Sequence, residues 1–265
     1  MNNLLKGKKG IIFGALDENS IAWKVALKAK EQGAEFVLSN APVALRLGKI
    51  NELAELCDTT VIAADATSIE DLENLFDQAT EKYGKLDFIL HSIGMSPNVR
   101  KNKAYTELNY DWFLKTLDIS ALSFHKVLQV AYQKDALNEW SSVVALTYVA
   151  AQRTFPGYND MAEAKATLES IARSFGYHYG TKKNVRVNTI SQSPTMTTAG
   201  SGVKGFDVFY DYANKLSPLG NASSDSCADF TIALFSDLTR MVTMQNLFHD
   251  GGFSSIGMTE AFMDE

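Results

Sequence analysis

The feature of this sequence that most constrains its fold is a regular alternation of short apolar runs with longer amphipathic ones. Runs typical of strands lie at residues 10–13, 35–38, 61–64, 88–91, 143–147, 185–190 and 246–249. Helical patterns lie between or after them, at residues 21–32, 44–56, 69–83, 110–136, 157–179, 206–216 and 226–235. Strands that alternate with helices are joined by right-handed crossovers into a parallel sheet. The sequence therefore predicts an α/β fold, a doubly wound parallel sheet of about seven strands with helices on both faces.

Composition and charge limit the partners that such a chain can have. The 265 residues carry a net charge of −6, which argues against a general surface for nucleic acid or anionic membranes. No apolar stretch is long enough for a signal peptide or a membrane span, so we expect a cytoplasmic protein. Cys57 and Cys227 are far apart and are expected to be free thiols. The four histidines show no metal-ligand spacing, and no metal site is predicted.

The residues that directly follow the strands are the first candidates for a binding site. In parallel sheets of this kind, ligands bind at the carboxyl ends of the strands, near the point where the strand order reverses. The residues at those ends are Gly14, Ala15, Ser39, Asn40, Ala41, Asp65, Ala66, Ser92, Ile93, Gly94, Tyr148 and residues 191–198.

The segment FGALDENSIAW, residues 13–23, occupies the place of a phosphate-binding loop. It has one glycine where the usual dinucleotide fingerprint has three. Gly14 can supply the tight turn after the first strand, and Ser20 is a good helix N-cap residue. The main-chain N–H groups of Ser20 and Ile21 would then face a pyrophosphate at the helix N-terminus. The segment alone is a weak signal, because many strand–loop–helix turns contain one glycine.

Three further strand ends bear on the nucleotide. The Asp65 carboxylate can accept a hydrogen bond from an adenine amino group, or it can simply be an acid at a helix start. Gly94 would let the main chain lie close to a ribose. NAD sites usually show an acid after the second strand and NADP sites a base, but residues 39–42 contain neither. We therefore favour NADH, while Arg46, one helical turn farther on, leaves NADPH open.

A tyrosine and a lysine after the fifth strand are the candidate catalytic residues. Tyr158 and Lys165 are seven residues apart in a predicted helix, which would place them on one helix face. A free tyrosine is a weak acid, with a pKa of about 10, unless a nearby cation assists it. A half-exposed tyrosine and a surface lysine are the alternative. The pattern Tyr-x-x-x-Lys also occurs at Tyr179 and Lys183, but at the amino end of a strand, and we interpret it as a chance match.

Five segments, taken together, resemble the bacterial enoyl-acyl carrier protein reductases, a divergent branch of the short-chain dehydrogenase/reductase family. They are GKKGIIFGALDENSIAW, LHSIGMS, YNDMAEAKATLESIARSFG, VRVNTISQSPTMTTAGSG and HDGGFSS, with the spacing Tyr148-x9-Tyr158-x6-Lys165. The resemblance implies one Rossmann-like domain over residues 1–265, with a substrate-binding flap at about 195–217. It also implies hydride transfer from NADH to the β-carbon of a trans-2-enoyl thioester on acyl carrier protein, by a homotetramer.

The resemblance also assigns roles to individual residues. Tyr158 would hydrogen-bond the thioester carbonyl and stabilise the enolate, Tyr148 would orient or protonate the substrate, and Lys165 would hold the nicotinamide ribose. The implied cofactor-binding residues are Gly14, Ala15, Ser20, Ile21, Ala41, Asp65, Ala66, Ser92, Ile93, Gly94, Lys165, Thr195, Met196, Thr197, Thr198 and Ala199. The implied substrate-binding residues are Ser96, Tyr148, Tyr158, Met161, Ala199 and Phe206.

The chain departs from the family pattern around residues 192–208. Gln192, Ser193 and Thr195 replace the usual residues, and basic residues that have been proposed to dock acyl carrier protein are missing after Lys204. The basic segment NVRKNK, residues 98–103, is a candidate replacement, and a solvated loop is the alternative.

Two other functions are weighed against the reductase. A 3-oxoacyl thioester reductase is disfavoured because Ala145 stands thirteen residues before Tyr158, where that class has a serine. A non-catalytic NAD(P)-binding regulator would have no need of the set formed by Tyr148, Tyr158 and Lys165.

Overall fold

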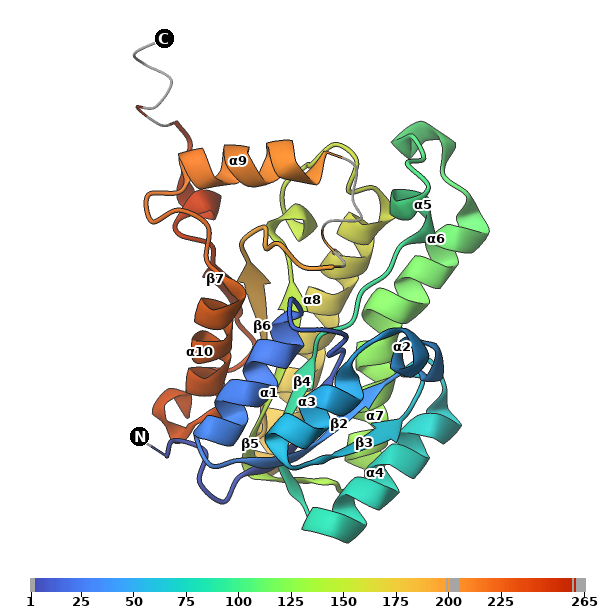
Figure 1. Ribbon diagram of the computed structural model, residues 1–265, viewed down its shortest axis with the longest axis vertical. Coiled ribbons are helices and arrows are strands. Elements are labelled where there is room, and N and C mark those ends of the chain that lie inside the picture. Colours follow the sequence, from blue (N-terminus) through green and yellow to red (C-terminus); the bar gives the residue numbers. More distant parts are fainter. Residues whose placement is uncertain (1–2, 199, 201–204, 259, 261–265) are drawn as a thin grey trace.

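The computed structural model describes residues 3–198, 200, 205–258 and 260. Its centre is a seven-stranded sheet in the order β3-β2-β1-β4-β5-β6-β7, with every neighbouring pair parallel (Figure 1). The strands are β1 (Lys9–Phe13), β2 (Glu35–Asn40), β3 (Thr60–Ala63), β4 (Leu86–His91), β5 (Leu137–Thr147), β6 (Arg186–Gln192) and β7 (Asn246–His249). This confirms the predicted doubly wound α/β fold, because the chain moves outward from β1 in one direction and then from β4 in the other.

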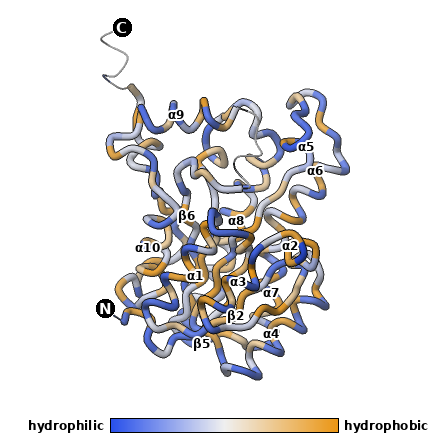
Figure 2. Tube along the Cα trace, in the orientation of Figure 1, coloured by the Kyte–Doolittle hydropathy of each residue, from blue (hydrophilic) through white to orange (hydrophobic). Residues whose placement is uncertain are grey.

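Helices cover both faces of the sheet. They are α1 (Ile21–Glu31), α2 (Pro42–Leu47), α3 (Ile50–Cys57), α4 (Ile69–Tyr83), α5 (Pro97–Arg100), α6 (Tyr110–Leu117), α7 (Ser123–Gln133), α8 (Asp160–Lys183), α9 (Phe206–Leu216) and α10 (Ser224–Phe235). One core lies between the sheet and α1, α3 and α10, and a second lies between the sheet and α4, α7 and α8. Apolar residues accordingly concentrate in the interior of the trace in Figure 2. No helix in the described part of the chain is long and apolar enough to cross a membrane.

Three predicted helices differ from the observed ones. The helix expected over residues 44–56 is two helices, α2 and α3, with Gly48 between them. The main chain at Gly48 lies close to Leu16: a Cβ atom at Gly48 would be 2.5 Å from the carbonyl oxygen of Leu16. The stretch 110–136 contains a π-helical turn, Asp118–Leu122, between α6 and α7. The helix expected from residue 157 begins at Asp160, so Tyr158 precedes it. The short helix α5 was not predicted, because its four residues are too few to show a period.

Candidate active site

The loops after β1 and β4 meet at the point where the strand order reverses. Gly14 has a φ of +92°, and a Cβ atom there would lie 1.9 Å from the carbonyl oxygen of Ser92. A larger residue would therefore separate the two loops. Gly14 closes the first loop onto the segment that carries Ser92, Ile93 and Gly94, which brings these predicted cofactor residues to one edge of the sheet.

The hydroxyl of Ser20 closes the first loop instead of capping the helix. Its Oγ accepts hydrogen bonds from the main-chain N–H groups of Leu16, at 3.1 Å, and Asp17, at 3.0 Å. Ser20 is still the N-cap residue by position, but its side chain bonds no N–H group of α1. The prediction that Ser20 is the N-cap residue is therefore confirmed by position, while its hydroxyl serves the loop. The first turn of α1 holds no acidic residue, so its N-terminus suits an anionic group of a ligand.

The second and third strand ends lie on the same edge. Asn40 donates from Nδ2 to the carbonyl oxygen of the buried Ala15, and Ala41 is the N-cap residue of α2. The Asp65 carboxylate accepts hydrogen bonds from the N–H group and the hydroxyl of Thr67, so it stabilises the turn before α4. The cap of α4 is Ser68, which accepts from the N–H group of Asp71. Ala66 is buried and packs in the core.

Lys165 crosses from α8 to the ends of β4 and β5. Its Nζ donates to the carbonyl oxygens of Leu146, at 2.9 Å, and Ile93, at 3.4 Å. The side chain is buried, and this burial lowers the pKa of its ammonium group to about 8, while the carboxylate of Glu169 acts in the opposite direction. A Cβ atom at Gly94 would lie 3.6 Å from Nζ. Because an ammonium group has three N–H donors, one is left for a ligand beside this loop.

Tyr148 and Tyr158 lie side by side, their ring centroids 5.1 Å apart. Tyr148 follows β5, and its ring also contacts Phe155 and, on α9, Phe209. Burial raises the pKa of both tyrosine hydroxyls above the ordinary value, so each is a neutral hydrogen-bond donor at pH 7. In the described part of the chain, the buried hydroxyl of Tyr148 has no hydrogen-bond partner. Buried polar groups are almost always paired, so this one marks a place for a ligand atom.

The argument that placed Tyr158 and Lys165 on one helix face is wrong. Tyr158 lies in the loop before α8, and Asn159 between this loop and the helix has a φ of +47°. Both residues still lie at the carboxyl edge, because the loop after β5 leads directly into the first turns of α8. The competing Tyr179 lies near the other end of α8, where its hydroxyl donates to the carbonyl oxygen of Leu128.

Of the other predicted substrate residues, Ser96 and Met161 are buried within the protein, whereas Phe206 lies on α9. Ser96 is buried and its hydroxyl is used within the protein, donating to Asp160 and accepting from the N–H group of Val99. Met161 packs in the core next to Gly94. Phe206 begins α9 and packs against Tyr210, with ring centroids 6.2 Å apart.

The segment after β6 reaches the loop after β1. Gln192 donates from Nε2 to Oγ1 of Thr195, at 3.2 Å, and the hydroxyl of Thr198 donates to the Asp17 carboxylate, at 2.6 Å. Thr197 accepts at Oγ1 from the N–H group of Gly200, and Met196 is exposed. Ala199 lies outside the residues that the structure describes.

Two buried carboxylates at this edge were not predicted. Asp160 is completely buried at the start of α8, and Glu169 is buried one turn beyond Lys165. Glu169 accepts from the Thr147 hydroxyl at 2.9 Å and from Gln152 at 3.0 Å, so it holds the chain on both sides of Tyr148. The one sequence signal available for either was an acidic residue close to Tyr158 or Lys165.

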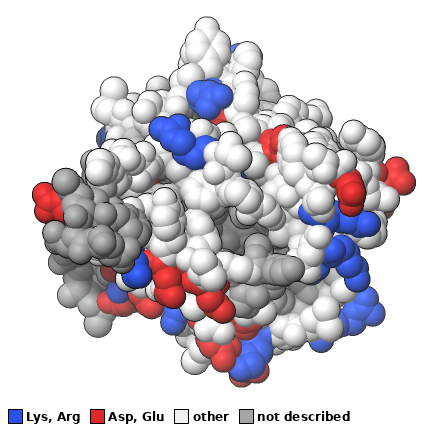
Figure 3. Space-filling model, turned by 90° about the horizontal axis from the view of Figure 1, so that it is seen from above, with Lys and Arg blue, Asp and Glu red and all other residues white. Residues whose placement is uncertain are grey.

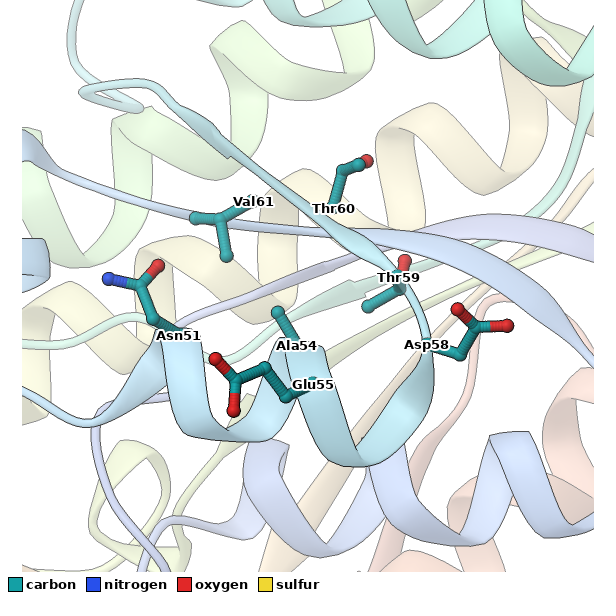
Figure 4. A pocket seen from close by; sticks show the side chains of 7 residues that line it. All are labelled: Asn51, Ala54, Glu55, Asp58, Thr59, Thr60 and Val61. Carbon is teal, nitrogen blue, oxygen red and sulfur yellow. The ribbon is translucent and has the colours of Figure 1, made fainter.

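Two further features of the described residues lie apart from the predicted site or are missing. The hollow drawn in Figure 4 lies between α3 and the start of β3, at the amino edge of the sheet, and none of its lining residues belongs to the predicted site. No group of three or more His, Cys, Asp or Glu side chains in the described residues can hold a metal ion. Figure 3 looks down on the carboxyl edge and shows largely uncharged surface in the middle, with both basic and acidic side chains toward its rim.

Comparisons with known proteins identify the family of the chain. The family model described as "Enoyl-(Acyl carrier protein) reductase" matches residues 14–254. The NADH-dependent enoyl-[acyl-carrier-protein] reductase 2 of Rhizobium meliloti is 32% identical, over 97% of this chain and 96% of that protein. The FabI–NADH complex from Alistipes finegoldii is 66% identical with a TM-score of 0.97, over 98% of this chain and 92% of that one. The enoyl-[acyl-carrier-protein] reductase (NADH) from Aquifex aeolicus is 29% identical with a TM-score of 0.89, over 97% of this chain and 100% of that one. The chain belongs to the enoyl-(acyl carrier protein) reductase family.

Proposed function

We propose that this protein is an NADH-dependent enoyl-[acyl-carrier-protein] reductase, which reduces the double bond of a trans-2-enoyl thioester. The observation that carries the proposal is the unpaired, buried hydroxyl of Tyr148, next to Tyr158 and at the same edge as Lys165. The solved FabI–NADH complex that this chain resembles contains the same cofactor. The family's reaction needs donors for a thioester oxygen and a cation for a ribose, and these side chains provide them.

The residues around the switch point fit NADH. The N-terminus of α1 suits the pyrophosphate, and the third donor of Lys165 suits a ribose hydroxyl. Asn40, the last residue of β2, and Ala41 after it introduce no cation for a ribose 2′-phosphate, and Arg46 lies in the last turn of α2. Residues 195–199 would hold the pyrophosphate and nicotinamide end, and the segment 195–217 would cover the substrate, with Phe206 toward it.

The two tyrosines act on the thioester. When bound, NADH supplies the hydride that adds to the β-carbon. Tyr158 donates a hydrogen bond to the thioester carbonyl oxygen, where negative charge develops, and Tyr148 orients the substrate and takes part in its protonation. Because burial raises both hydroxyl pKa values, the tyrosines are protonated at pH 7 and can donate hydrogen bonds to the oxygen where that charge forms. The aromatic rings of Phe155 and Phe209 exclude water from this side of the site.

The test of this proposal is NADH oxidation with a crotonyl thioester and, in parallel, an acetoacetyl thioester. Wild type is expected to reduce only the enoyl substrate, and Tyr158→Phe should lower its kcat by about 100-fold. Reduction of the oxo substrate instead would favour the 3-oxoacyl reductases, although Ala145 stands where they have serine. NADH binding without turnover of either substrate would favour the non-catalytic regulator.

We also propose that acyl carrier protein, an acidic partner, docks on Arg100, Lys101 and Lys103. All three side chains are exposed, and the carbonyl oxygen of Lys103 accepts a hydrogen bond from Asn159, at 2.7 Å, directly after Tyr158. The patch is therefore next to the catalytic loop. Changing the three residues to glutamate should raise KM about tenfold for an acyl carrier protein substrate and leave KM for a coenzyme A substrate unchanged. Equal effects on both substrates would contradict the docking site.

We further propose that the enzyme is a homotetramer of the cytoplasm, with α8 and residues 248–258 at its interfaces. The half-exposed ring of Phe248 and the exposed Tyr177 are apolar surface of the kind such contacts cover. Light scattering should give four times the 29.1 kDa mass of one chain. A monomer would contradict this assignment.

A further inference from the structure

The carboxylate of Asp160 is a buried charge that the proposed reaction does not use directly. It is completely buried and accepts hydrogen bonds from three side chains. The donors are Ser96 Oγ at 2.6 Å, Asn98 Nδ2 at 2.9 Å and Thr116 Oγ1 at 2.7 Å. Burying an unpaired carboxylate is strongly unfavourable, whereas short bonds from polar donors offset much of the cost. Asp160 is also the first residue of α8, where the helix dipole favours negative charge.

The three donors fix the segment 96–117, between β4 and α7, to the start of α8. Ser96 caps α5, and Asn98 is bonded in both directions to the main chain of Asn109, which is the cap of α6. Thr116 lies in α6 itself. A single carboxylate therefore links α5 and α6 to α8. Removing it would leave three buried donors without their common acceptor.

The same anchor lies two residues after Tyr158. Between them, Asn159 has a φ of +47° and donates from Nδ2 to the carbonyl oxygen of Lys103, so two successive residues are tied to the 96–117 segment. The carbonyl oxygen of Tyr158 accepts from the N–H group of Met161, which joins Tyr158 to the first turn of α8. With the start of α8 held in this way, the loop that precedes it has little freedom to move the Tyr158 ring.

We infer that Asp160 is a positioning residue, which sets the place of the Tyr158 hydroxyl through the loop between them. The inference rests on the proposed function, because it assumes that Tyr158 bonds the thioester oxygen. A misplacement of about 1 Å in a catalytic group is enough to lower a rate substantially. Both carboxylate oxygens accept hydrogen bonds from the protein, so the carboxylate acts through the position of Tyr158.

A double-mutant cycle between Asp160→Asn and Tyr158→Phe tests this inference, with kcat measured at saturating crotonyl thioester and NADH. Asp160→Asn should lower kcat about tenfold when Tyr158 is present and less than about twofold when residue 158 is phenylalanine. The dissociation constant for NADH should not change. Thr116→Val, which removes one donor and keeps the carboxylate, should lower kcat about threefold with the same dependence on Tyr158, and it decides the question if Asp160→Asn does not fold.

Ser142→Ala is the matched control, since it removes a buried hydrogen bond to the carbonyl oxygen of Leu234, far from the carboxyl edge. It should lower the free energy of unfolding and leave kcat unchanged. Equal losses of kcat in both backgrounds, or no loss in Asp160→Asn, would overturn the inference alone, as would a parallel rise in the NADH dissociation constant. Wild-type kcat in Tyr158→Phe would overturn the catalytic assignment and this inference together.

Discussion

Each edge of the sheet holds a buried cation and a tyrosine with a buried hydroxyl, and the hydrogen bonds of these groups differ between the edges. At the amino edge, Arg186 donates to the carbonyl oxygens of Leu234, Ser236 and Thr239, and Tyr179 donates to that of Leu128. At the carboxyl edge, Lys165 has two main-chain acceptors for its three donors. The buried hydroxyl of Tyr148 has no partner in the described chain. Within the described residues, the amino edge thus pairs the Tyr179 hydroxyl and both terminal nitrogens of Arg186, although Arg186 Nε has no partner, and the carboxyl edge leaves donors for a ligand.

Whether a buried donor has an acceptor within the protein indicates whether the residue serves stability or ligand binding. A buried donor with an acceptor in the protein stabilises the fold, whereas one without an acceptor lowers stability until a ligand is bound. Tyr179 and Lys183 have the spacing of a known catalytic motif, yet Tyr179 is completely buried and paired. Hydrogen bonding therefore distinguishes Tyr179, whose hydroxyl is paired, from Tyr148, whose hydroxyl is not, whereas a sequence motif alone would not.

The largest expected effect is on Lys165, the buried cation of the carboxyl edge. Lys165→Met should raise the NADH dissociation constant about tenfold to 100-fold, because a charged donor to the ribose is lost. Since burial lowers the pKa of Lys165 to about 8, NADH affinity of the wild type should fall as pH rises through that value. Fluorescence titration from pH 7 to pH 10 checks this, and the methionine variant should show the smaller dependence on pH. Equal dependence in both proteins would contradict the role of the ammonium group.

Stability should respond to the same ionisation with the opposite sign. The pKa of Lys165 is about 8 in the fold against 10.5 for the unperturbed side chain, so the unfolded chain binds more protons between these values. Without NADH, the free energy of unfolding of the wild type should therefore rise with pH across this window, relative to Lys165→Met. Urea unfolding at several pH values measures this difference. A fall across the window would show that the ammonium group is stabilised in the fold.

A smaller effect, confined to stability, is expected for the cation of the amino edge. Arg186→Leu leaves the carbonyl oxygens of Leu234, Ser236 and Thr239 without these donors, and should lower the free energy of unfolding by about 3 kcal/mol. Urea unfolding measures this change, and kcat of the folded fraction should stay within about twofold of wild type. A large loss of kcat with unchanged stability would break the distinction between the two edges.

The sequence predicted the layout of the sheet well because strands and helices of this chain have clear and different periods. The apolar run 10–13 and the helix 69–83 match the structure almost residue for residue. The break at Gly48 and the start of α8 were not predictable, since both depend on contacts that are distant in sequence: Leu16 packs against the former and Lys103 accepts a bond near the latter.

In the candidate site, too, local features were predictable and contacts between distant residues were not. Gly14 could be assigned from local turn chemistry, and the structure gives it the positive φ that such a turn needs. The role of the Ser20 hydroxyl could not be assigned from the sequence, because a serine before a helix can accept from N–H groups of the loop or of the helix. Asp160 and Glu169 were not found, because a buried acid looks like any helical acid until its donors are known. Tyr148 and Lys165 share one edge because the loop after β5 leads directly into α8, and this adjacency could be predicted.

The most direct test of the difference between the edges is the same substitution at their two buried tyrosines, with kcat and the free energy of unfolding measured on each variant. Tyrosine to phenylalanine removes only a hydroxyl. Tyr148→Phe should lower kcat about tenfold and leave stability unchanged or higher by up to about 1 kcal/mol, because an unpaired buried hydroxyl is lost. Tyr179→Phe should lower stability by about 1 kcal/mol and leave kcat within about twofold of wild type. The reverse pattern, with catalysis dependent on Tyr179 and stability on Tyr148, would contradict the account.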